Sequence, residues 1–317
     1  VLLVTSTTAR PHRAVAAGTV TPNSTVAKWI TGITQSSLAP LVNEYSGETP
    51  TVVGGRSLTL TTRAEASGEM IDLAEQWVYE HLASYGLSSV SYAPYPGRGT
   101  VSPGRNVIGE IRGSITPNDV VIISCHIDDR PFFRTSTVAY GADDGAGGCA
   151  AVLRIAQAFA GHRFANTIRF AFFNAEENGA WMSTAWGSGY YAAQARANGE
   201  RITAMISGDS LAWNPSNTRT VYMVTRAPTK DPGGGDHAIA SLWQQVTAAY
   251  GITGIAPTVQ ESGDNLDDHG AFWNAGYPAV MLIEEDVVQV NPNWEQLTDR
   301  VSTFNWPYYV QNEIGRA

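Results

Sequence analysis

The chain has 317 residues, of which 43% are hydrophobic and 15% are charged. This length suits one large α/β domain with a substantial core, and the composition excludes an intrinsically disordered chain. The 20 basic and 29 acidic side chains give a net charge of −9, and no basic stripe is visible, which argues against nucleic-acid binding. No apolar run reaches about 18 residues, so the sequence predicts no membrane-spanning helix.

Residues 1–25 are rich in Ala, Thr and Val and are predicted to form an N-terminal arm, followed by a single domain over residues 26–317. The chain begins with Val1 rather than Met, so we expect that a leader has been removed or was never included. Asn23 begins the triplet Asn-Ser-Thr, an acceptor for N-glycosylation. With the low Lys content and the acidic charge, these features favour a secreted, extracellular protein.

Hydrophobic periodicity predicts both helices and strands along the domain. The expected helices are 26–47, 67–86, 146–160, 181–198, 237–250 and 301–314. The expected strands are 106–111, 120–124, 167–173, 202–207 and 279–283. Several of these strands are apolar throughout, as is typical of strands covered on both faces. Their alternation with helices predicts an α/β fold, a single domain with a mostly parallel, mixed central sheet sandwiched by helices.

Acidic side chains and an imidazole follow three of the predicted strands, at the point where each strand ends. These residues are His126, Asp128, Glu176, Glu177 and Asp209. A further carboxylate, Asp144, precedes a helix start made of small residues, where the helix N-terminus favours negative charge. Because the carboxyl ends of parallel strands meet at one edge of a sheet, these groups should converge. Carboxylates gathered so closely would repel one another without a cation, so the sequence predicts a metal site.

The segments around these residues resemble the di-zinc aminopeptidase family, which also includes glutaminyl cyclases and glutamate carboxypeptidases. The matching segments are SCHIDD (124–129), YGADDGAGG (140–148), FFNAEENG (172–179), ISGDS (206–210), DDHGAFWNAGYPAV (267–280) and NWEQLTD (293–299). Two upstream segments are also similar, GGRSLTLTTR (54–63) and GRNVIGEIRG (104–113). The resemblance spans most of residues 120–300 in the family's order.

The resemblance implies a role for each matching residue. His126 and Asp209 would bind one zinc ion, Glu177 would bind another, and Asp144 would bridge the two. Glu176 would be the general base. In such a site the metal polarises a carbonyl group and activates a water molecule near neutral pH, and a carboxylate carries the proton to the leaving amine.

Two further residues would support the site without binding metal. The resemblance implies that Asp128 orients the ring of His126 and that Asp268 makes hydrogen bonds within the site. Arg130 and Arg134 follow the His126 strand; they are predicted to be surface arginines, although they could meet a substrate carboxylate. The acidic run 284–286 is predicted to be a solvated turn.

One position departs from the family's pattern. Glu295 stands where the family has its last metal-binding His, although the flanking residues match. Glu295 could still bind metal, giving an all-oxygen second site that suits zinc less well than other divalent ions. Alternatively, the second site could be empty, leaving one ion, or the whole site could be degenerate. The sequence leaves these three interpretations open.

Cys125 directly precedes His126, and Cys149 lies five residues after Asp144. The strand end and the helix start that contain them should be neighbours. A disulfide between them would resemble animal-type glutaminyl cyclases; two buried thiols are the alternative. The leading hypothesis is a secreted metallo-aminopeptidase acting on a peptide or small amide with a free amino terminus. The alternatives are a glutaminyl-cyclase-like acyl transfer and a peptidase-fold protein with a lost metal site. The sequence does not indicate the oligomeric state.

Overall fold

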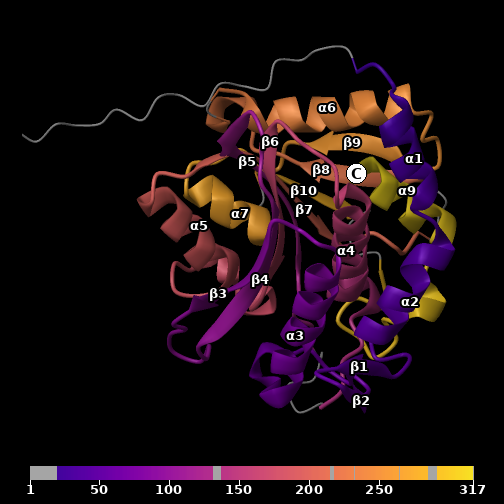
Figure 1. The fold of residues 1–317 in the computed structure, drawn as a ribbon, viewed down its shortest axis with the longest axis vertical. Helices are drawn as coiled ribbons and strands as arrows, with labels where there is room; N and C mark the ends of the chain where they lie inside the picture. Colours follow the sequence, from indigo (N-terminus) through magenta and orange to yellow (C-terminus); the bar gives the residue numbers. More distant parts are fainter. Residues whose placement is uncertain are drawn as a thin grey trace, which may run out of the picture.

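The computed structural model describes residues 20–130, 137–214, 218–231, 233–263, 265–284 and 291–316. Its centre is an eight-stranded mixed sheet with the strand order β3-β4-β6-β5-β7-β10-β8-β9 (Figure 1). The four central strands β6, β5, β7 and β10 run parallel to one another. Their carboxyl ends therefore lie along one edge, as the apolar, doubly covered strands of the sequence predicted.

The outer strands pair in both directions. The strands β3 and β8 are antiparallel to their inner neighbours, and β9 is parallel to β8. The strands of the sheet are β3 (Ser89–Tyr95), β4 (Gly104–Ile111), β5 (Thr116–His126), β6 (Asn166–Phe173), β7 (Arg201–Asp209), β8 (Thr220–Val224), β9 (Ala256–Gln260) and β10 (Val280–Glu284). A separate hairpin consists of β1 (Thr51–Val53) and β2 (Arg56–Leu58).

Helices cover both faces of the sheet. The α-helices are α1 (Ser24–Gly32), α2 (Gln35–Tyr45), α3 (Glu69–Ser84), α4 (Gly148–Phe159), α5 (Gly187–Ala197), α6 (Gly235–Ala249), α7 (Asp268–Asn274) and α9 (Trp306–Arg316). Figure 1 shows α5 and α7 on one side of the sheet and α3 and α4 on the other. Short turns of helix lie between them, among them η2 (Ala142–Gly147) and η3 (Glu176–Asn178). The predicted α/β sandwich is confirmed.

Alternate residues of each strand fill the cores on the two faces. In β5, Ile123 packs with the α3 and α4 side, whereas Ile122 packs with the α5 and α7 side. Both are almost fully buried, as a strand covered on two faces requires. In the part of the chain that the structure describes, no helix is long and apolar enough to cross a membrane.

The element boundaries differ from the sequence predictions in a few places. The predicted helix 26–47 is two helices, because Thr34 adopts an extended conformation and caps α2 with a reciprocal hydrogen bond to Ser37. Three strands of the central sheet were missed: β3, β8 and β9. The strands β3 and β9 contain Pro94 and Pro257 and are the two outermost strands of the sheet, where a missing amide hydrogen is tolerated.

Candidate metal centre

The imidazole of His126 lies at the end of β5 and faces two carboxylates. Its Nε2 atom is 3.2 Å from Oδ1 of Asp144 and 3.1 Å from Oδ1 of Asp209, which ends β7. Burial by itself would lower the pKa of His126, but the hydrogen bonds and charges of Asp144 and Asp209 outweigh it and raise that pKa. The ligand atoms of the three side chains lie within 4.8 Å of one another, close enough to share one divalent cation.

The turn η2 holds Asp144 in place. Gly145 has φ 99°, a conformation that favours glycine, and a Cβ atom there would lie 2.9 Å from a main-chain carbonyl oxygen. The carboxylate of Asp299 accepts hydrogen bonds from the amides of Asp143 (2.9 Å) and Asp144 (3.1 Å). The backbone that presents Asp144 to the imidazole is therefore fixed from both sides.

A buried arginine, Arg63, ties the loops of the site together. Its guanidinium donates hydrogen bonds of 2.9 Å to the main-chain carbonyls of Tyr45, Ile127, Tyr140 and Gly141. It also lies 3.4 Å from the carboxylate of Asp129, which accepts the Arg63 amide N–H. Arg63 has no exposed surface. Arg63 ends one of the matching segments but has no predicted role, because its partners are carbonyl groups, which leave no pattern in a sequence.

Asp128 contacts both sides of the centre. The Nδ1 atom of His126 is 3.1 Å from the main-chain oxygen of Asp128 and 3.9 Å from its carboxylate. That carboxylate accepts hydrogen bonds from the amides of Glu176 and Glu177, both of 3.1 Å. The ring is therefore oriented by the main chain of Asp128, while the side chain positions the next loop. Burial raises the pKa of Asp128 to about 7, although the charge of His126 opposes the shift.

Glu176 and Glu177 begin the turn η3, which two residues separate from the end of β6. One carboxylate oxygen of each lies within 4.8 Å of the other and of a ring nitrogen of His126. Burial raises the pKa of both groups well above the usual range, and nearby carboxylates add to the shift. Among the described residues, Oε1 of Glu177 is buried without a hydrogen-bond partner. A divalent cation would supply that partner and offset the repulsion, so these residues fit a bound metal.

Asp268 begins α7 and is completely buried. Burial raises its pKa to about 6, with Ser188 opposing the shift. The preceding residue, Asp267, caps the helix, accepting from the amide of Asp268 and, at 3.3 Å, from the hydroxyl of Ser207. The charges of both aspartates act on Glu176, so the pair belongs to the environment of the centre. Asp267 was part of a matching segment but had no predicted role.

The prediction of a solvated acidic turn is wrong for Glu284. This residue ends β10 with no exposed surface, and its Oε1 atom accepts a hydrogen bond of 2.9 Å from the side chain of Asn291. Burial raises the pKa of Glu284, and the charge of Asp143 adds to the shift. The Oε2 atom of Glu284 also accepts a hydrogen bond of 2.8 Å from the amide of Trp213, so the loop after β7 helps to cover the end of the strand. Glu285 and Asp286 lie outside the described residues.

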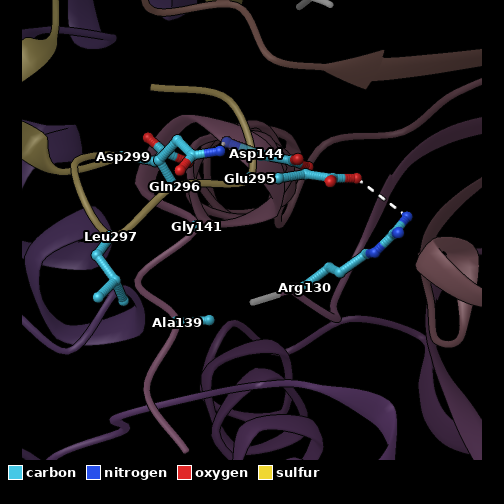
Figure 2. Close-up of a pocket in the computed structure, with 8 residues that line it drawn as sticks. All are labelled: Arg130, Ala139, Gly141, Asp144, Glu295, Gln296, Leu297 and Asp299. Atoms are coloured by element: carbon cyan, nitrogen blue, oxygen red, sulfur yellow. Dashed lines mark hydrogen bonds and ion pairs between the residues drawn. The ribbon is translucent and has the colours of Figure 1, made fainter. Parts of the chain in front are cut away.

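Glu295 lies beside Asp144 but faces Arg130. The two residues and Asp144 line one small cavity of about 10 Å³ (Figure 2). The Oε1 atom of Glu295 is 3.1 Å from a guanidinium nitrogen of Arg130. Burial raises the pKa of Glu295, and Arg130 opposes the shift. Glu295 is in neither of the two groups of potential metal ligands found in the described chain. Arg134 lies outside the described residues.

The two cysteines are neighbours, as predicted. The Sγ atoms of Cys125 and Cys149 are 3.0 Å apart, and both residues are buried thiols in this structure. The Cys149 thiol also lies 3.0 Å from the main-chain oxygen of His126. A disulfide between them stays a prediction.

Asn23 lies at the exposed start of α1. Its Oδ1 atom accepts a hydrogen bond of 2.9 Å from the amide of Val26, which caps the helix. The cap uses the side-chain oxygen, whereas glycosylation would use the side-chain nitrogen. Glycosylation of Asn23 and secretion stay predictions, as does the boundary between arm and domain, since residues 1–19 lie outside the described part.

A larger cavity, of about 580 Å³, opens next to the centre. Glu177 and Asn178 line one side of it. The rest of the lining comes from segment 61–70, including Thr62 and Glu65, from Thr100 in the loop between β3 and β4, and from Asp129, Arg130 and Thr137 after β5. The buried cluster of carboxylates therefore has direct access to a space that can hold a substrate residue.

Comparison with known proteins identifies the family. The model of peptidase family M28 matches residues 106–313, a span that contains all the predicted metal-binding and catalytic residues. The chain belongs to peptidase family M28. The resemblance to the di-zinc aminopeptidases and their relatives is confirmed. Leucine aminopeptidase 1 of Aspergillus fumigatus is 25% identical over 219 residues, covering 65% of this chain and 52% of that protein. The M28 chain thus spans about half the length of the curated relatives it matches.

Two solved structures share the fold of this M28 chain. The LapA aminopeptidase of Legionella pneumophila superposes with a TM-score of 0.73 at 14% identity, covering 95% of this chain and 73% of that chain. A glutaminyl cyclase of Porphyromonas gingivalis superposes with a TM-score of 0.65 at 21% identity, covering 89% and 95%. Because the fold occurs in both kinds of protein, it does not by itself distinguish hydrolysis from cyclisation.

Proposed function

We propose that this M28 chain is a zinc-dependent aminopeptidase that hydrolyses the N-terminal bond of a peptide or small amide. The observation that supports the proposal is the placement of two groups of metal ligands around one imidazole, with Glu176 among them. His126, Asp144, Asp209 and Glu177 would hold the zinc. One nitrogen and several carboxylate oxygens suit a catalytic zinc site.

Each of the residues around the centre would have its own role in hydrolysis. When bound, zinc polarises the scissile carbonyl and lowers the pKa of a water molecule. Glu176 is placed to take a proton from the attacking water and pass it to the leaving amine, because its carboxylate lies with the potential metal ligands around His126. Asp128 fixes the turn that carries Glu176 through main-chain hydrogen bonds, so the carboxylate is held before substrate arrives.

The charge around the centre favours a substrate with a free amino group. Three carboxylates, those of Glu65, Asp129 and Glu177, line the 580 Å³ cavity against one guanidinium, that of Arg130, and the chain as a whole carries a net charge of −9. A protonated α-amino group is attracted into such surroundings, whereas a free carboxylate is repelled by them. We therefore propose an N-terminal rather than a C-terminal exopeptidase. We also propose that it acts outside the cell, because of the low Lys content, the acidic charge and the acceptor triplet at Asn23.

The proposal is tested with Glu176→Gln. We expect hydrolysis of aminoacyl anilides to fall about 10³-fold, while the zinc content and the unfolding temperature stay close to those of the wild type. Glu261→Gln, which removes a half-exposed carboxylate away from the centre, is the matched control and should keep the wild-type rate. Wild-type turnover by the Glu176→Gln variant would refute the assignment of the base.

Cyclisation of N-terminal glutamine is the second candidate, and the neighbouring cysteines are the feature that favours it. The same preparations should be incubated with Gln-peptides and analysed by mass spectrometry. Loss of ammonia from the peptides, without hydrolysis of anilides, would establish the cyclase. A wild-type protein with neither zinc nor turnover would instead indicate a binding protein with a lost metal site.

A further inference from the structure

The ion pair between Arg130 and Glu295 occupies the place where the family resemblance puts a metal-binding histidine. The guanidinium nitrogen is 3.1 Å from Oε1 of Glu295. The Glu295 side chain is 9% exposed and the Arg130 side chain 43% exposed, so the arginine reaches in from the surface. Figure 2 shows the carboxylate of Glu295 directed at Arg130, with Asp144 beside it.

The remaining ligands gather around His126, away from this pair. One group joins His126 to Asp144 and Asp209, and the other joins His126 to Glu176 and Glu177. Neither group contains Glu295. Among the described residues, the nitrogen donor of both groups is the same imidazole, which can coordinate a single ion through Nε2 because its Nδ1 atom faces the main-chain oxygen of Asp128.

The guanidinium changes the electrostatics on the far side of Asp144. A second divalent ion there would have to compete with Arg130 for Glu295, and the guanidinium would repel it for as long as the ion pair is formed. The cavity shared by Asp144, Glu295 and Arg130 holds about 10 Å³, room for about one water molecule. A cation with its own ligands therefore needs the arginine to move away.

We propose that this chain binds one divalent cation, held by His126, Asp144 and Asp209 with Glu177 beside them, and that the Arg130–Glu295 ion pair occupies the place of a second cation. The inference rests on the proposed function in taking the centre to bind zinc. It goes further in fixing the number of ions and in assigning Arg130 to the centre.

The backbone conformation of Glu295 permits a substitution that tests this proposal. Glu295 has φ 55°, in the left-handed region, where histidine is found several times more often than most side chains. Glu295→His should therefore fold, and it restores a nitrogen donor beside Asp144. Arg130→Gln removes the guanidinium from a half-exposed position, where the change costs the fold little.

The experiment counts zinc per chain by elemental analysis after dialysis against buffered zinc, and repeats the count by cobalt(II) titration, followed by visible absorption. We expect one ion per chain in the wild type, one in Arg112→Gln and two in the double variant Arg130→Gln/Glu295→His. Arg112 is the matched control because it lines a cavity at the opposite edge of the sheet. Circular dichroism confirms that each variant is folded.

The other outcomes overturn the inference in different ways. Two ions per wild-type chain would show that Arg130 does not exclude the second cation. One ion in the folded double variant would show that the pair does not control the number of ions. Either result leaves the aminopeptidase proposal standing if the anilides are hydrolysed, whereas no zinc and no turnover in the wild type would remove both.

Discussion

The two sides of the centre are built differently. On the side of His126 and Asp144, each ligand is held by buried groups that themselves bond to the main chain, such as Arg63 and Asp299. On the side of Glu295, the carboxylate sits on a turn and pairs with one half-exposed arginine. Buried, fully bonded networks are costly to disturb, whereas an ion pair that reaches the solvent contributes little. The side of His126 and Asp144, the anchored side, is therefore preorganised. The side of Glu295 is open to change.

The largest effect should come from Arg63→Met. Methionine fills part of the space but leaves four carbonyl groups and Asp129 without their buried partner, so we expect a loss of about 3–5 kcal/mol in the free energy of unfolding. Urea denaturation measures it. The control Arg56→Met breaks an exposed pair with Glu69 and should cost under about 1 kcal/mol. Equal losses in the two variants would show that the buried contacts of Arg63 stabilise the fold no more than an exposed ion pair does.

Glu75→Gln tests the anchored side through pH. Glu75 accepts a hydrogen bond of 2.8 Å from Asn174, two residues before Glu176 and Glu177 begin their turn, and burial raises its pKa to about 7 against the pull of Arg105. Because this pKa lies above the unfolded value, near 4.3, its stabilising contribution is complete below that value and is lost as pH rises through about 7.

Between pH 5 and 8 the wild type should therefore lose up to about 3 kcal/mol more stability than Glu75→Gln, at about 1.4 kcal/mol per unit of pKa. Urea midpoints at the two pH values measure the difference. Glu69→Gln, which changes an exposed carboxylate, should follow the wild-type profile. Parallel profiles for wild type and Glu75→Gln would show that this carboxyl group does not change its proton affinity on folding.

A smaller loss is expected for Asp299→Asn. The carboxylate of Asp299 accepts two amide N–H groups, and asparagine would present an NH₂ group to one of them. We expect a loss of about 1–3 kcal/mol in stability and of about 10–100-fold in zinc affinity, measured by calorimetric titration. Asp72→Asn, at an exposed carboxylate, is the control. Unchanged zinc affinity would mean that the η2 backbone does not depend on Asp299.

The smallest effect should come from Glu295→Gln. Arg130 can turn to water when its partner loses its charge, and the burial cost of the Glu295 carboxylate disappears at the same time. We expect the free energy of unfolding to change by less than about 1 kcal/mol in urea. A loss as large as that of Arg63→Met would place the pair with the anchored side.

Much of this molecule was predictable from local patterns. Continuous apolar runs identified the central strands, because a strand covered by helices on both faces has no solvated side to alternate with. Strands end where their apolar run ends, so His126, Glu176 and Asp209 could be assigned to one edge of the sheet. The edge strands β3 and β9 escaped prediction because half-exposed strands containing proline lack that pattern.

Other properties depend on contacts between residues far apart in the sequence. Arg63, Asp299 and Glu284 act through main-chain groups and buried side chains brought together only by the packing of loops on the sheet edge. The ion pair between Glu295 and Arg130 also joins residues that are far apart in the sequence. A sequence shows that a carboxylate replaces a histidine there, but only the folded chain brings Arg130 against it, because ion pairs form across space and leave no periodicity along the chain.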